Sequence, residues 1–186
     1  FEKMAAVNLA GKKVYSSSDA LSSQQEQLIY GSLLGDSGLS RPATAKGHAF
    51  FKCKHSIKQK EYLGMKAKIL GNFLSGNVRL DVASQAIDGY TRNDTVTATS
   101  IRHSIFTDIR NLVYPEGKKT VTQEWLSKID ERGLAFWYFD DGHLHNDKYS
   151  NNIRINLATN SFSENEVKLL QNWLLTKWGI KSKYYK

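Results

Sequence analysis

Two segments of this chain end in the same unusual way. Residues 29–38 read IYGSLLGDSG and residues 134–143 read LAFWYFDDGH, so each is an apolar run that leads into an aspartate followed by a small residue. An ionised carboxylate beside buried apolar side chains must be paired, hydrogen-bonded, metal-bound or neutralised, because an isolated charge is expensive to desolvate. The repeat therefore predicts two related halves, with Asp36 and Asp141 in matching positions.

Both acidic segments carry the pattern of helices. Ser23 precedes Glu26 by three residues, the spacing of a capping box, which predicts a helix from about 24 to 35. The second apolar segment is expected to be helical over 131–140. Ser163 and the glutamate three residues after it repeat the capping-box spacing, which predicts a further helix there.

The segments between these helices alternate like strands. In residues 48–56, HAFFKCKHS, Phe51, Cys53 and His55 fall on one side and Lys or Ser on the other, which predicts a strand with one basic, solvent-facing side. Further strands are expected at 77–84, at 95–102 and in a hairpin within 143–160, and further helices at 58–74 (with Tyr62, Met65, Ile69 and Phe73 on one side), 103–113 and 122–129. Each half thus reads helix, strands, helix.

Packing the two acidic helices side by side through Gly31, Ser32 and Ala135 would bring their last turns together. The carboxylates of Asp36 and Asp141 would then repel each other unless a cation lay between them. Mg²⁺ is the expected occupant, since it is a hard ion that takes oxygen ligands and keeps several waters. A metal beside a basic strand surface suits phosphodiester hydrolysis.

The alternative is that both aspartates are turn residues at helix ends. An acidic residue at a helix C-terminus opposes the helix dipole, which makes a purely structural role less favourable than usual. Asp140 is instead expected to be a turn or hydrogen-bonding group rather than a metal ligand. His143 and His145 lack a convincing third ligand nearby, so a solvent-facing or phosphate-contacting role is expected for them.

The charge of the chain indicates a polyphosphate partner. There are 26 Lys and Arg against 18 Asp and Glu, for a net charge of +8, and the basic residues are interleaved with aromatic and polar ones. A solvated sheet face is the other account of them. The strand-like segments carry the expected nucleic-acid-binding residues Lys52, Lys54, Arg79, Arg102 and Arg154.

Other features exclude several classes of protein. No apolar run approaches the roughly 18–20 residues of a membrane span, and Cys53 is the single cysteine, so there is no internal disulfide or cysteine metal cluster. An intracellular setting without membrane contact is therefore expected. The four tryptophans lie in helical segments with apolar neighbours, so they are expected to pack rather than to stack on bases.

At this point the chain resembles a known family, the LAGLIDADG homing endonucleases, in their single-chain, two-motif form. Residues 134–142, LAFWYFDDG, match the motif closely, and residues 29–36, IYGSLLGD, match it with Ser37 where the glycine usually stands. The stretches KQKEYL after the first ribbon and GKKT before the second motif are similar to the mitochondrial intron-encoded members.

The resemblance implies an α+β fold of two αββαββα halves, whose motif helices form the central interface and whose sheets form saddles on the DNA major groove. By matching position, Asp36 and Asp141 are the implied metal ligands and catalytic residues, with Mg²⁺ as cofactor. Lys119, or its neighbour Lys118, is the implied basic residue that polarises water or steadies the phosphate. The expected parts are a polar arm at 1–21, a first half at 22–117 and a second half at 118–186 that lacks its last two strands and helix.

The leading expectation is a monomeric, site-specific, magnesium-dependent double-strand DNA endonuclease with an internal pseudo-dimer, in an intracellular and mitochondrial setting. The alternative is a catalytically inactive RNA-binding derivative, such as a splicing maturase or a ribonucleoprotein component. The incomplete second half favours the alternative and the two retained aspartates oppose it. A glycosidase that uses the acidic pair is disfavoured, because it accounts for neither the charge nor the repeat.

Overall fold

The computed structural model describes residues 20–41, 47–83, 93–147 and 152–185. It is a mixed α and β structure built around two central helices, α1 (Ser23–Leu34) and α5 (Glu131–Asp141), which lie side by side. A sheet follows each of them, as the α+β prediction required. Most of the expected N-terminal arm lies outside the described residues.

The start of α1 corrects the predicted capping box. Ser22, not Ser23, is the N-cap residue: its hydroxyl accepts from the Gln25 amide at 3.3 Å, and the Gln25 side chain accepts from the Ser22 amide at 2.9 Å. Gln25 can replace Glu at the third helical position because its side-chain oxygen also accepts a hydrogen bond. The capping box predicted at Ser163 is confirmed, with Glu166 as its partner.

The first half holds a four-stranded antiparallel sheet. Its strands lie in the order β1 (Ser37–Ser40), β2 (Phe50–Ser56), β4 (Thr95–Thr99), β3 (Arg79–Asp81). Strand β2 alternates as predicted, with Phe51, Cys53 and His55 buried. This sheet is accompanied by α2 (Lys60–Leu70), α3 (Ser104–Val113) and the 3₁₀ turns Ile57–Gln59, Gly71–Phe73 and Pro115–Gly117.

Helix α2 buries a different face from the one predicted. Met65 was expected on the apolar side but is 41% exposed, and the buried residues are Leu63, Lys66, Ala67 and Leu70. A lysine at a fully buried position breaks the apolar pattern from which a helix face is predicted, so the pattern pointed to the wrong side.

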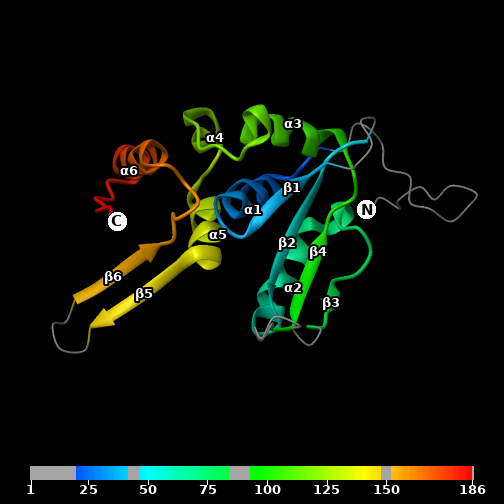
Figure 1. The fold of residues 1–186 in the computed structure, drawn as a ribbon. Coiled ribbons are helices and arrows are strands. Elements are labelled where there is room, and N and C mark those ends of the chain that lie inside the picture. The colour runs from blue at the N-terminus through cyan, green and yellow to red at the C-terminus, as the bar shows by residue number, and fades with distance from the viewer. Residues whose placement is uncertain (1–19, 42–46, 84–92, 148–151, 186) are drawn as a thin grey trace, which may run out of the picture.

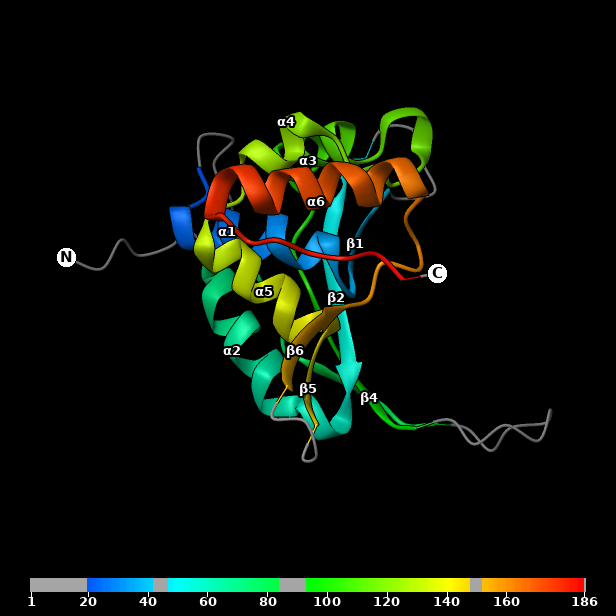
Figure 2. The same ribbon diagram turned by 90° about the vertical axis from the view of Figure 1, so that its left-hand side faces the viewer.

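The second half holds a two-stranded ribbon, β5 (Gly142–Asp147) paired with β6 (Asn152–Leu157). Helices α4 (Gln123–Ser127) and α6 (Glu164–Trp178) complete this half. Figure 1 shows β2 and β4 diverging from β5 and β6 below the α1–α5 pair, with α3, α4 and α6 on the opposite side. In the perpendicular view of Figure 2, α3, α4 and α6 again lie on the side away from β5 and β6.

The core lies between the central helices and the layer formed by α3, α4 and α6, and it also includes buried residues of β2, β4 and α2. Leu28, Ile29 and Leu33 of α1 have no solvent exposure, so the C-terminal part of α1 is buried in this core. Trp125, Trp137 and Trp173 are buried as predicted. Among the described residues, no helix is long and apolar enough to cross a membrane.

Candidate active site

The central helices approach each other most closely at two glycines. A β-carbon on Gly31 of α1 would overlap the backbone carbonyl of Gly133 in α5. The predicted contact through Gly31 is therefore present, and its partner on α5 is Gly133. Ser32 is fully buried and Ala135 is half-buried. Because no side chain separates the backbones, the two helix ends reach the same region.

The last turns also meet. A β-carbon on Gly35 would lie 2.5 Å from the β-carbon of Asp140, so only glycine leaves room for Asp140 at this point. Gly35 and Asp140 each precede one of the predicted catalytic aspartates, Asp36 and Asp141. The two acidic ends therefore converge, as the repeat predicted.

The electrostatics of the two aspartates reflect this convergence. Burial, followed by the negative charges of Asp36 and Asp140, raises the pKa of Asp141 to about 6. The pKa of Asp36 is also raised, first by burial and then by Asp140, although nearby basic side chains oppose the rise. The side chain of Asp36 is 49% exposed, so a ligand can reach it. Each carboxylate is thus held in an environment that a cation would relieve.

Lys119 lies beside the same helix ends. Its ammonium group donates to the carbonyl oxygens of Leu33 at 2.8 Å and Ser37 at 2.9 Å, on either side of Asp36. Burial lowers the pKa of Lys119, against the opposing effect of Asp141 and Asp36. The structure therefore brings Lys119 to the acidic centre, whereas Lys118 is exposed.

The side chain of Asp140 is buried and hydrogen-bonded, as expected for a hydrogen-bonding group. One of its oxygens accepts from Lys66 at 2.5 Å and from the Tyr62 hydroxyl at 2.8 Å. His55 lies next to this pair, with its Nε2 at 3.1 Å from the Lys66 ammonium and its Nδ1 at 3.8 Å from Asp36. Burial and the Lys66 charge lower the pKa of His55.

The sequence prediction missed Lys66 and the role of His55. Lys66 lies among the apolar residues of α2, and the strand pattern placed His55 on the side of Phe51 and Cys53 without indicating a partner for it. The sequence contained an indication of this burial, because helical spacing places Lys66 on the same side of α2 as Leu63, Ala67 and Leu70. A buried lysine requires a buried anion, and Asp140 was the candidate left without a partner.

The described residues offer two accessible carboxylates to a divalent ion. No group of three or more His, Cys, Asp or Glu side chains in the described ranges could hold a metal. Asp36 and Asp141 nevertheless fit Mg²⁺, which is commonly held by one or two carboxylates with water and substrate phosphates completing its shell. The metal-ligand assignment stays a prediction.

A basic surface extends from this centre along the first sheet. The register pairs Lys54 with Thr97 and Thr97 with Arg79, so these side chains point to one face, and Lys52 opposite Thr99 shares it. Asp81 on this face forms an ion pair with Arg79 at 2.7 Å. Lys52 and Lys54 also lie on this face, and Lys54 is exposed.

Two other predicted binding residues lie elsewhere. Arg102 is exposed in the loop after β4, because that strand ends at Thr99 rather than at 102, and its guanidinium lies 5.8 Å from the Phe50 ring centre. Arg154 is exposed on β6 opposite His145, so the second ribbon carries both groups on its polar face. The exposure of His145 is consistent with the phosphate contact expected for it.

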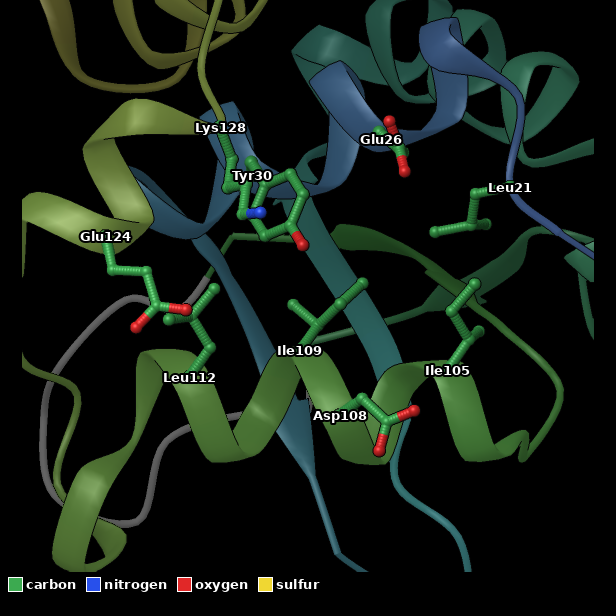
Figure 3. Close-up of a pocket in the computed structure, with 9 residues that line it drawn as sticks. All are labelled: Leu21, Glu26, Tyr30, Ile105, Asp108, Ile109, Leu112, Glu124 and Lys128. Atoms are coloured by element: carbon green, nitrogen blue, oxygen red, sulfur yellow. The ribbon is translucent and has the colours of Figure 1, made fainter.

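A separate hollow of about 270 Å³ lies between α1, α3 and α4 (Figure 3). Its rim carries the carboxylates of Glu26, Asp108 and Glu124, with Lys128 as the basic residue among its lining side chains. Neither Asp36 nor Asp141 lines it. Because this rim would repel phosphate, the hollow does not extend the basic surface.

Comparison with known proteins places the chain in a family. The model of the LAGLIDADG DNA endonuclease family matches residues 26–186. A protein named RecA from Mycolicibacterium flavescens is 32% identical over 139 residues, which are 72% of this chain and 30% of that protein. The cytochrome b mRNA maturase bI2 of Debaryomyces hansenii is 26% identical over 167 residues, covering 89% of this chain and 61% of that one.

The structural comparison agrees with the predicted fold. The homing endonuclease I-WcaI, solved bound to its DNA recognition sequence, aligns with a TM-score of 0.76 and 24% identity over 90% of this chain and 74% of that chain. At this identity the likeness shows the fold, and the chain spans less than two thirds of the curated relatives named above. Since the family model covers most of its length, the protein belongs to the LAGLIDADG DNA endonuclease family.

Proposed function

We propose that the protein is a site-specific, magnesium-dependent endonuclease that cleaves both strands of a DNA duplex. The observation that carries this proposal is the convergence of Asp36 and Asp141, with the pKa of Asp141 raised to about 6. Two mutually repelling carboxylates beside a basic sheet are suited to a divalent ion and a phosphodiester. Membership of the family and the structural likeness to a DNA-bound homing endonuclease support the same activity.

In this proposal Asp36 and Asp141 hold Mg²⁺, which when bound would activate water and neutralise charge on the leaving oxygen. Lys119 is the group that orients water or steadies the scissile phosphate. It is anchored by the carbonyl oxygens of Leu33 and Ser37, so its charge is fixed beside Asp36. Burial lowers the pKa of Lys119, while Asp141 and Asp36 oppose that shift and favour the charged form.

The basic face supplies the binding energy for DNA. Lys52 and Lys54 lie on β2, Arg79 on β3 and Arg154 on β6. The four-stranded sheet and the two-stranded ribbon that carry them diverge below the α1–α5 pair (Figure 1). A two-stranded ribbon fits the major groove of B-form DNA, where base edges can be read. Contacts to phosphates by these cations would fix the register of the duplex over the two aspartates.

An RNA-binding role is the second candidate, because one relative is a cytochrome b mRNA maturase that aligns with 89% of this chain. On that account the basic face would bind structured RNA and the two aspartates would be retained without a catalytic role. Both candidates share the cationic surface, so charge does not distinguish between them. Cleavage of DNA distinguishes them, because only the first candidate cuts a duplex.

The test begins with a pool of duplexes carrying randomised sequence, incubated with the protein and either Mg²⁺ or EDTA. Sequencing of the new ends should reveal one preferred site, cut in Mg²⁺ alone, and the Asp141→Asn variant should leave that site intact. Cleavage that persists in EDTA or in the variant would refute the proposed site. Tight, salt-sensitive binding of structured RNA with no cut in any duplex would establish the second candidate instead.

A further inference from the structure

A cluster of polar side chains is buried between the two halves of the molecule. The side chains of Lys66 and Asp140 have no solvent exposure, and His55 is 3% exposed. Lys66 donates to Asp140 at 2.5 Å, Tyr62 donates to the same carboxylate oxygen at 2.8 Å, and Lys66 lies 3.1 Å from His55. The cluster joins α2 and β2 of the first half to the end of α5 in the second.

Stability alone does not account for this arrangement. Taking an ammonium and a carboxylate out of water costs several kcal/mol per ion, and well-packed apolar side chains of similar volume often serve as well or better. The apolar neighbours Leu63 and Leu70 show that α2 can bury hydrocarbon here. A charged pair at this position therefore suggests a task beyond holding the halves together.

The cluster contacts the acidic centre on two sides. Asp140 is the residue before Asp141, so whatever fixes Asp140 also fixes the backbone that carries Asp141. His55 lies between the two acidic ends, with its Nδ1 3.8 Å from Asp36 and its Nε2 3.8 Å from Asp140. In the described structure, His55 Nδ1 and the second oxygen of Asp140 have no hydrogen-bond partner.

Within the described residues, the matching positions of the other half hold no such cluster. Gly35 occupies the position that matches Asp140, and a side chain there would collide with it. Ser37 pairs with Cys53 in the first sheet, and Gly142 pairs with Leu157 at the equivalent position of the second. His55 lies two residues after Cys53, so its counterpart is Thr159, two residues after Leu157. The first half thus supplies the basic and aromatic side chains that hold the reactive end of the second.

We propose that Lys66, Tyr62 and His55 are positioning residues: they clamp Asp140 and so hold the carboxylates of Asp141 and Asp36 in the geometry needed for cleavage. This inference rests on the proposed function and adds residues outside the two motifs to the machinery of the site. Groups that orient metal-binding side chains typically contribute about 10–100-fold to metal affinity or activity. A clamp of this kind should affect the rate more than the binding of DNA.

The discriminating variant is the double substitution Lys66→Met with Asp140→Leu, which replaces the ion pair by uncharged side chains of similar volume. It is compared with the wild type, with Tyr62→Phe, and with Lys68→Met, an exposed lysine on the same helix. Each protein is measured by thermal unfolding, by affinity for the cleavable duplex in EDTA, and by single-turnover cleavage of the two separately labelled strands in Mg²⁺.

We expect the double variant to remain folded and to bind DNA within about threefold of wild type, while its cleavage rate falls by about 10–100-fold. Tyr62→Phe should lose about three- to tenfold in rate, since one hydrogen bond is worth about 1 kcal/mol, and Lys68→Met should cleave normally. Wild-type cleavage rates in both the double variant and Tyr62→Phe would overturn the proposal and leave the cluster with a structural role. A wild-type protein that cuts no duplex would refute the proposed function itself, and this inference with it, before any variant is measured.

Discussion

Gly31 and Gly133 face each other across the central helix pair, and a β-carbon on Gly31 would overlap the Gly133 carbonyl. This contact allows the backbones of α1 and α5 to approach closely enough for their acidic ends to share one region. Its importance for stability can be measured against another helical glycine, because Gly64 of α2 has open space where a β-carbon would stand.

Gly31→Ala should destabilise the protein by about 1–3 kcal/mol, since added volume in a packed contact forces the helices apart. Gly64→Ala should stabilise it by about 0.5–1 kcal/mol, because alanine loses less conformational entropy in a helix. The free energy of unfolding of both variants, measured in urea, tests these two values. Equal effects of the two substitutions would show that the close approach is not required.

The raised pKa of Asp141 predicts a pH-dependent gain in stability for Asp141→Asn. Because the folded-state pKa of about 6 exceeds the ordinary 3.8, ionisation of this group weakens the folded state as pH rises through that window. The asparagine variant should therefore be more stable at pH 8 by about 1 kcal/mol, a figure reduced for the partial exposure of the group. The gain should be absent at pH 3.5.

Unfolding is followed in EDTA so that no cation masks the repulsion. A gain of the same size at both pH values would mean that the carboxylate is not the cause. The same pKa predicts that cleavage slows as pH falls below about 6, because the proton and the cation compete for Asp141.

The open face of β2 predicts the salt dependence of nucleic-acid binding. Lys54 is exposed beside Thr97 and Arg79, so Lys54→Ala should lower the affinity and reduce the slope of log K against log salt by about 0.9 for one lost phosphate contact. Lys168→Ala on α6, which lies on the side opposite the ribbons (Figure 1), should leave the slope unchanged. Identical slopes for Lys54→Ala and wild type would exclude β2 from the interface.

The two ribbons differ in how far their apolar faces are covered, and this difference predicts unequal costs of truncation. When the strand pairs of the two halves are matched, Phe51 of β2 and Ile155 of β6 occupy equivalent positions. Phe51 is fully buried, whereas Ile155 is 65% exposed. Phe51→Ala should cost about 3–5 kcal/mol, whereas Ile155→Ala should cost less than about 0.5 kcal/mol. A cost above about 2 kcal/mol at Ile155 would mean that the apolar face of β6 is covered in solution.

Local patterns in the sequence predicted much of this structure. The period-two alternation of β2, the capping box at Ser163 and the acidic ends of α1 and α5 are set by residues close in the chain, and the structure contains all three. The helix predicted over 58–74 forms over Lys60–Leu70, and Phe73 is buried as its spacing predicted, but Met65 is exposed. Lys66 is buried instead, through a partner that lies 74 residues away.

Tertiary contacts determine the features of the fold and the site that local sequence patterns did not predict. The meeting of Gly31 with Gly133 depends on the relative shift of two helices, which no local pattern encodes. The position of His55 between Asp36 and Asp140 depends on three elements at once. By contrast, the convergence of Asp36 and Asp141 was predictable because the repeat itself implied a twofold arrangement.

The account depends most on the claim that Asp36 and Asp141 together form one metal-dependent cutting centre. The most direct measurement is single-turnover cleavage of the selected duplex, with each strand labelled, by wild type, Asp36→Asn, Asp141→Asn and the control Asp108→Asn from the separate hollow. Wild type and Asp108→Asn should cut both strands in Mg²⁺ and neither in EDTA, and each central variant should lose at least about 100-fold in rate. Full cleavage by either central variant, or by wild type in EDTA, would contradict the account.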